Sequence, residues 1–77
     1  MGLNDLKIGG QLQNGYIIDA LHIGASGGYV LAHSPHPDTP EPYVVWNLDR
    51  HGDTHTGRYY VSSVDAGHHF RRLYRSA

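Results

Sequence analysis

Histidine is the residue type that most directly suggests chemistry, because seven histidines occur among the 77 residues. Six of them form three closely spaced pairs: His33 and His36, His51 and His55, and His68 and His69. Zinc requires three or four nitrogen, oxygen or sulfur ligands, which usually come from two such pairs. A histidine-based metal-binding domain is therefore one hypothesis, although the sequence contains no His-Glu-x-x-His motif.

The segment 51–57, HGDTHTG, has a simpler interpretation as the tip of a β-hairpin. Gly52 adopts a positive φ without steric cost, as a tight turn between two strands requires. Polar residues around such a glycine are ordinary turn residues. We therefore predict a turn at 50–53, and neither a metal nor another cofactor.

The sequence carries no catalytic motif. Serine, histidine and aspartate are present, but no Gly-x-Ser-x-Gly elbow occurs, and so small a domain buries too little surface to tune a pKa. The glycine-rich stretch 22–30, HIGASGGYV, lacks the Gly-Lys-Ser/Thr of a phosphate-binding loop. We predict that the protein is not an enzyme and that residues 24–28 form a turn between strands.

Composition indicates one small intracellular domain. The apolar fraction of 39% is too high for a disordered chain, and the absence of cysteine excludes a disulfide framework. No apolar run approaches the roughly 20 residues of a membrane span, and the N-terminus lacks the pattern of a signal peptide. We expect a single domain over 1–77 in the cytoplasm, without membrane contact.

Alternating apolar residues predict four main strands. They cover 16–23, 29–33, 43–49 and 54–61, with a short strand near 10–13 before an Asn-Gly turn at 14–15. The connector 34–42 holds all four prolines and is neither helix nor central strand. Within 43–49, Val44, Trp46 and Leu48 share one face, which we take as the core face. Gly57 falls within a strand, which predicts a bulge or a close approach by Trp46.

A C-terminal helix is predicted over 63–75. Residues 62–65, SSVD, have the spacing of a capping box. Four apolar side chains at helical spacing should pack on the sheet, namely Ala66, Phe70, Leu73 and Tyr74. The fold class is therefore α+β, an antiparallel four-stranded sheet with one C-terminal helix packed on one face and residues 1–9 expected to be flexible.

The pattern of packing residues over 16–75 resembles a group of small bacterial proteins encoded on plasmids, phages and integrative elements. The matching positions are Val30-Leu31, Pro42-Tyr43-Val44 with Trp46, Gly52, Gly57 with Tyr59, and Ala66 with Phe70. The sequence departs from the group's pattern at Ala32, Val45, Thr56, Arg58 and His69. The resemblance implies a ββββα layout and an origin on a mobile element, where small proteins often block a defence complex, as anti-CRISPR proteins do.

These observations predict a non-catalytic protein-interaction module. The resemblance makes its partner a protein complex of a host or competitor defence system. Tyrosine and arginine dominate interface hot spots, so the predicted partner-binding residues are Tyr43, Arg58, Tyr60, Arg71, Arg72 and Arg75. We expect a tyrosine-rich sheet face left open by the helix to bind this partner, and an exposed edge strand to permit a homodimer.

Nucleic-acid binding is the main alternative. Residues 46–77 carry five arginines against three aspartates, although the whole chain has a net charge of −1. The arginines of the C-terminal helix would contact phosphates, and tyrosines of the sheet would stack on bases. The histidine-based metal domain remains the third hypothesis.

Overall fold

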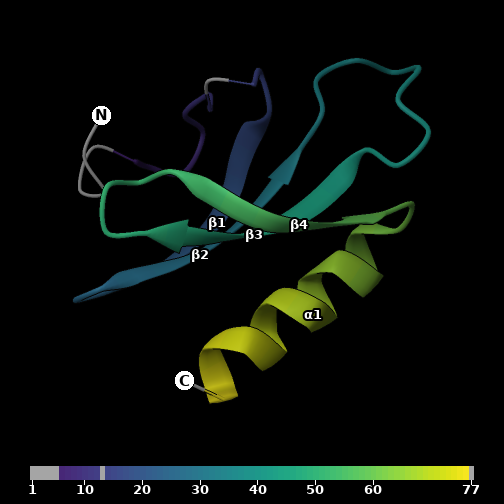
Figure 1. Ribbon diagram of the computed structural model, residues 1–77. Coiled ribbons are helices and arrows are strands. Elements are labelled where there is room, and N and C mark those ends of the chain that lie inside the picture. Colours follow the sequence, from purple (N-terminus) through teal and green to yellow (C-terminus); the bar gives the residue numbers. More distant parts are fainter. Residues whose placement is uncertain (1–5, 13, 77) are drawn as a thin grey trace.

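The computed structural model describes residues 6–12 and 14–76. Four strands and a helix follow one another along the chain (Figure 1): β1 (Ile17–Gly24), β2 (Gly27–His33), β3 (Tyr43–Asp49), β4 (Thr54–Tyr60) and α1 (Ser63–Ser76). The strands form one antiparallel sheet in the order β1-β2-β3-β4. Helix α1 packs against this sheet. The prediction of an α+β fold with a C-terminal helix is confirmed.

Connections between strands differ slightly from the predicted ones. Strands β1 and β2 extend further than expected, so that Gly24 pairs with Gly27 and the turn shortens to residues 25–26. The predicted short strand near 10–13 is wrong for residues 10–12, because Gln11 makes an isolated bridge to Ile17 and no strand forms there. Residue 13 lies outside the described residues. A tight turn does follow at 14–15, where the backbone N–H of Tyr16 donates to the Asn14 side chain.

The sheet is buried on both faces, which corrects our prediction of one open face. The core on one face contains Leu12, Ile18, Val30, Ala32, Val44, Trp46 and Leu48, with Leu6, Tyr16 and Leu21 packed against it. Residues of the N-terminal segment, Leu6 and Leu12, thus help to bury this face of the sheet. Helix α1 lies on the opposite face, where Val45 packs with Ala66 and Phe70. Consecutive buried residues in β3 reflect this two-sided burial.

The tyrosine-rich face is therefore the face under the helix. Tyr29, Tyr43 and Tyr60 are half-buried and pack against the cluster of Val45, Ala66 and Phe70. Of the segment 1–9 that we expected to be flexible, residues 1–5 lie outside the described part of the chain. Leu6 packs against the core on the face of the sheet away from the helix. The N-terminal segment therefore helps to bury that face, which the sequence did not predict.

Helix α1 begins as predicted. The Ser62 hydroxyl accepts hydrogen bonds from the backbone N–H groups of Val64 and Asp65, at 3.2 and 3.5 Å. A side-chain acceptor at this position satisfies donors that the first helical turn leaves unpaired. The four apolar side chains predicted to face the sheet all do so.

The close approach predicted at Gly57 is also confirmed. The register of β3 and β4 shifts between Val45 and Asn47, which marks a β-bulge opposite Trp46. A Cβ atom on Gly57 would overlap Nε1 of the Trp46 indole and lie 2.7 Å from its Cδ1. Thr56, next to this glycine, has a φ of 49°. The indole therefore occupies the space in which a side chain of residue 57 would stand.

Within the described part of the chain, no helix has the length and apolar character that crossing a membrane requires.

Candidate functional site

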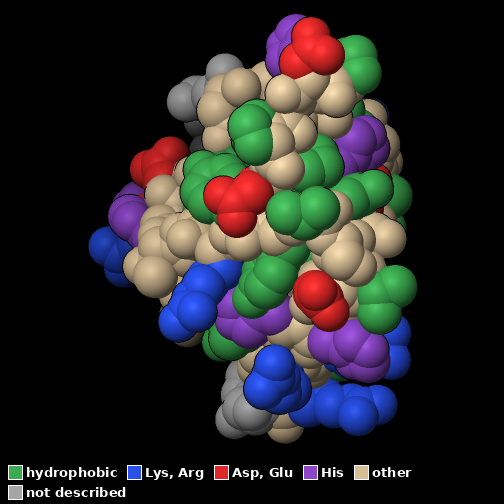
Figure 2. All heavy atoms as spheres, turned by 90° about the vertical axis from the view of Figure 1, so that its right-hand side faces the viewer, with side chains coloured by type: hydrophobic (Ala, Val, Ile, Leu, Met, Phe, Trp, Pro, Cys, Tyr) green, Lys and Arg blue, Asp and Glu red, His purple; other side chains and the backbone are tan. Residues whose placement is uncertain are grey.

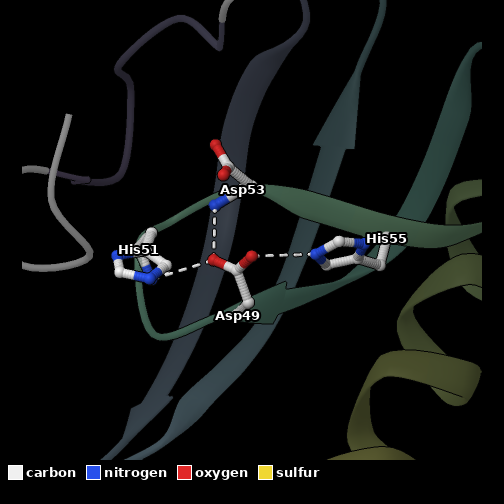
Figure 3. Close-up of polar contacts among 4 residues, drawn as sticks. All are labelled: Asp49, His51, Asp53 and His55. Atoms are coloured by element: carbon white, nitrogen blue, oxygen red, sulfur yellow. Dashed lines mark hydrogen bonds and ion pairs between the residues drawn. The ribbon is translucent and has the colours of Figure 1, made fainter.

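The segment HGDTHTG is organised around one carboxylate, that of Asp49 (Figure 3). Its Oδ1 atom accepts hydrogen bonds from the backbone N–H groups of His51 and Asp53, at 2.8 and 3.0 Å. Its Oδ2 atom lies 2.9 Å from Nε2 of His55. Gly52 has a φ of 87°. The predicted turn, with a positive φ at this glycine, is thus confirmed.

These contacts favour the charged form of Asp49. The hydrogen bond from His55, followed by the backbone hydrogen bonds from Asp53 and His51, lowers the pKa of Asp49 to about 2. A carboxyl group whose folded pKa is depressed stabilises the fold above its ordinary pKa, and this contribution is lost as the pH falls toward 2. The turn is therefore expected to loosen in acid.

Replacing Asp49 by asparagine tests this dependence. We expect D49N to be less stable than the wild type at neutral pH, and the difference to shrink as the pH falls from about 4 to 2. Urea unfolding followed by Trp46 fluorescence at several pH values measures it. Asp53→Asn is the control, because Asp53 contributes its backbone N–H to this turn. A difference between D49N and wild type that is independent of pH would contradict the assignment.

The histidine pairs do not converge on one point. His33 contacts the Asp19 carboxylate at 2.8 Å, His55 contacts Asp49, and His22 stacks on Tyr74 with ring centroids 4.9 Å apart. Among the described residues, no group of three or more histidine or acidic side chains is arranged to hold a metal ion. His22, His33 and His55 therefore serve separate local contacts.

A shallow groove of about 360 Å³ lies at the glycine-rich turn. Its lining comes from the ends of three strands: His22, Gly24, Ser26, Gly27, Gly28, Tyr29, Asn47 and Leu48. A Cβ on Gly27 or Gly28 would overlap a backbone oxygen, of Leu48 or His22 respectively. These two glycines are thus explained by close strand packing. None of the predicted partner-binding residues lines this groove.

The predicted partner-binding residues divide into two sets. Tyr43 and Tyr60 are cross-strand partners on the helix side of the sheet, and Arg58 lies on the same face of β4 two residues before Tyr60. On α1, residues advance about 100° per position, so Arg72 is turned toward one flank, whereas Arg71 and Arg75 point to the other flank and to solvent. The structure therefore brings Arg72 to the side of β4 and leaves Arg71 and Arg75 apart.

His69 joins this first set, although it was not among the predicted partner-binding residues. Its ring centroid is 5.7 Å from that of Tyr60. Its Nδ1 atom is buried and has no hydrogen-bond partner in the part of the chain that the structure describes. Burial, and then the positive charges of Arg58 and Arg72, lower the pKa of His69. The i, i+3 spacing of His69 and Arg72 is the signal that places both on one flank.

Exposed apolar side chains lie next to these polar ones. In the described residues, five large hydrophobic side chains are exposed, and three of them stand where β4 leads into α1, namely Tyr59, Val61 and Val64. Figure 2 looks onto this end of the molecule and shows hydrophobic side chains across its middle, with acidic side chains among them and with basic and histidine side chains mainly below them. We call the set of Arg58, Tyr60, Val61, His69 and Arg72 the β4–α1 surface.

The chain matches no protein-family model, no curated protein and no solved structure. The resemblance to proteins of mobile elements therefore stays a prediction from the residues quoted for it.

Proposed function

We propose that this domain is a non-catalytic protein-interaction module that binds a partner protein through the β4–α1 surface. The observation that carries the proposal is an exposed valine at the point where β4, with Arg58 and Tyr60, leads into α1. Val61 is 70% exposed and directly follows Tyr60, whose ring contacts His69 of the helix. Interfaces combine such an apolar centre with a polar rim, and tyrosine and arginine carry a large share of their binding energy.

The identity of the partner is a further part of the proposal. A protein complex of a host or competitor defence system, bound in the manner of an anti-CRISPR inhibitor in the cytoplasm, is suggested by the resemblance alone. A homodimer through an edge strand also stays a prediction. The bulge of β4 at residues 56–57 weighs against pairing through that edge, since bulges interrupt the regular ladder that a second strand would continue.

Nucleic-acid binding receives less support from the arrangement of the side chains. Base stacking requires exposed aromatic faces. Tyr29, Tyr43 and Tyr60 are half-buried with the helix, and Tyr59 makes edge contacts with Trp46 and Tyr16. The arginines of α1 also point to different sides of the helix.

A matched pair of exposed aliphatic residues tests the proposed surface. Val61 is 70% exposed on the β4–α1 surface, and Ile8 is 67% exposed in the N-terminal segment. The tagged protein is incubated with lysate of its own host, with and without nuclease treatment, and bound proteins are identified by mass spectrometry. We expect Val61→Asp to abolish recovery of the partner and Ile8→Asp to preserve it, because a charge buried in an interface is costly.

Two outcomes would reject the proposal. Equal recovery with both variants would show that the partner binds elsewhere. Recovery that depends on nucleic acid, with an affinity that falls linearly with the logarithm of salt concentration, would assign the arginines to phosphate contacts.

A further inference from the structure

The groove at the turn between β1 and β2 has aromatic and polar walls and a floor without side chains. His22, Tyr29 and Asn47 line it and are register partners across three strands. They lie on the face that carries the helix, because Tyr29 packs in the helix-side cluster and cross-strand partners share a face. Two residues nearer the turn, Gly24 and Gly27 pair on this face and add no side chain. The hollow of about 360 Å³ therefore suits a small, thin ligand.

The imidazole ring of His22 is held in one orientation by the end of the helix. It stacks on Tyr74, in the last turn of α1, with ring centroids 4.9 Å apart and 24° between the ring planes. Tyr74 in turn packs edge-on against the buried Phe70. The β1–β2 hairpin and the C-terminal end of α1 thus extend to the same side of the molecule (Figure 1). A planar ring bound in the groove would continue this stack on the other face of the imidazole.

Asn47 supplies hydrogen-bonding groups that the fold does not use. Its side chain is exposed and makes no hydrogen bond within the part of the chain that the structure describes. A side-chain amide presents a donor and an acceptor in one plane, and these match the donor and acceptor on the edge of a nucleobase. Neighbouring strands are about 4.8 Å apart, so His22 and Asn47 stand about 10 Å apart across β2. This separation leaves room for a ring between the imidazole and the amide.

The charges around the groove disfavour an anionic ligand. No lysine, arginine, aspartate or glutamate is among the described residues that line it. Asp49 pairs with Gly27 of the floor, and its carboxylate is charged at neutral pH because hydrogen bonds, first that from His55, lower its pKa to about 2. A negative charge in this position repels a phosphate or carboxylate. We propose that the groove binds the base of an uncharged nucleoside, stacked on His22 and hydrogen-bonded to Asn47.

Nucleosides test the site on the whole protein. Adenosine and uridine are titrated while the backbone amide signals are followed by NMR. We expect at least one of them to shift the signals of the groove residues saturably, with a dissociation constant of roughly 0.1 to 1 mM. Asn47→Leu and His22→Ala should each weaken binding at least about fivefold. His22→Phe should retain binding because a phenyl ring restores the stack. His68→Ala, the same truncation at an exposed histidine of α1, should change nothing.

Each other result overturns the inference. Absence of saturable binding by both nucleosides, or equal binding by wild type and folded Asn47→Leu, would reject the site. Tighter binding of adenosine monophosphate than of adenosine would show that phosphate is recognised, and equal binding of ribose would show that the sugar is. Loss of binding in His22→Phe, with an unchanged circular dichroism spectrum, would mean that an imidazole nitrogen and not stacking holds the ligand. The titration uses no partner protein, so its result is independent of the test of the β4–α1 surface.

Discussion

Replacing Phe70 by alanine is expected to remove most of the stability of this domain. Phe70 is 7% exposed and, with Ala66 of the same helix, packs with Val45 of the sheet, while its ring packs edge-on against Tyr74. Truncating a buried phenylalanine costs about 3 to 5 kcal/mol. A domain of this size has a total unfolding free energy of roughly 4 to 12 kcal/mol. The variant should therefore be marginally folded at 25 °C.

The measurement also tests whether the two cores unfold together. Trp46 belongs to the core on the opposite face of the sheet from Phe70. Urea unfolding is followed both by Trp46 fluorescence and by the helical signal in circular dichroism. We expect Phe70→Ala to lower both midpoints equally, whereas Val64→Ala, an exposed control, should change either by little. Loss of the helical signal with an unchanged Trp46 midpoint would show that the two cores are independent.

Local features of this fold were predictable because they depend on neighbouring residues. The bounds of β3, the turn at Gly52 and the serine cap of α1 follow from alternation, positive φ and side-chain acceptors close in sequence. The contact of Gly57 with Trp46 was also foreseen. The glycine inside β4 indicated that another group approaches the strand closely, and Trp46 is the large side chain on the neighbouring strand that could do so.

The assignment of the sheet faces was not predictable in the same way. Val44, Val45 and Trp46 are consecutive and all buried, so alternation does not say which face meets the helix. The answer depends on Leu12 and on the segment around it, which the sequence presents as a short strand. Its role as a cover for one face arises from tertiary packing, which local patterns do not encode.

The candidate surface was likewise predictable within each element but not between elements. The spacing of Arg58 and Tyr60, and that of His69 and Arg72, predicts that each pair shares one side of its own element. Whether the two pairs meet depends on how α1 lies across β4. That orientation is set by the packing of Phe70 and its neighbours, so the contact of His69 with Tyr60 follows from the structure alone.

Glycine substitutions at two positions are expected to change stability in opposite directions. At Gly57 a Cβ atom would overlap the Trp46 indole, which is 6% exposed. The indole has little freedom to move, because Tyr16 and Tyr59 pack edge-on against it at 5.3 and 6.1 Å. Overpacking of a rigid core costs about 1 to 3 kcal/mol. We expect Gly57→Ala to fall in the upper half of this range.

Gly67 provides the matched control within α1. A Cβ atom at this position would have no neighbour within 4 Å, and alanine is favoured over glycine in a helix by about 1 kcal/mol. Gly67→Ala should therefore raise the free energy of unfolding. Both variants are compared by urea unfolding monitored by circular dichroism. This signal does not depend on Trp46, so it also serves for variants in which Trp46 is replaced.

A double-mutant cycle isolates the cause of the Gly57 effect. In Trp46→Phe the smaller ring leaves room beside residue 57, so Gly57→Ala should cost much less in that background than in the wild type. An equal cost in both backgrounds would mean that the backbone of the bulge, and not the indole, requires glycine. Because Trp46 and Val45 face opposite cores from adjacent positions of β3, a clash at the indole also shifts the strand that supports α1. The contact between Tyr60 of β4 and His69 of α1 is therefore expected to depend on Gly57 as well.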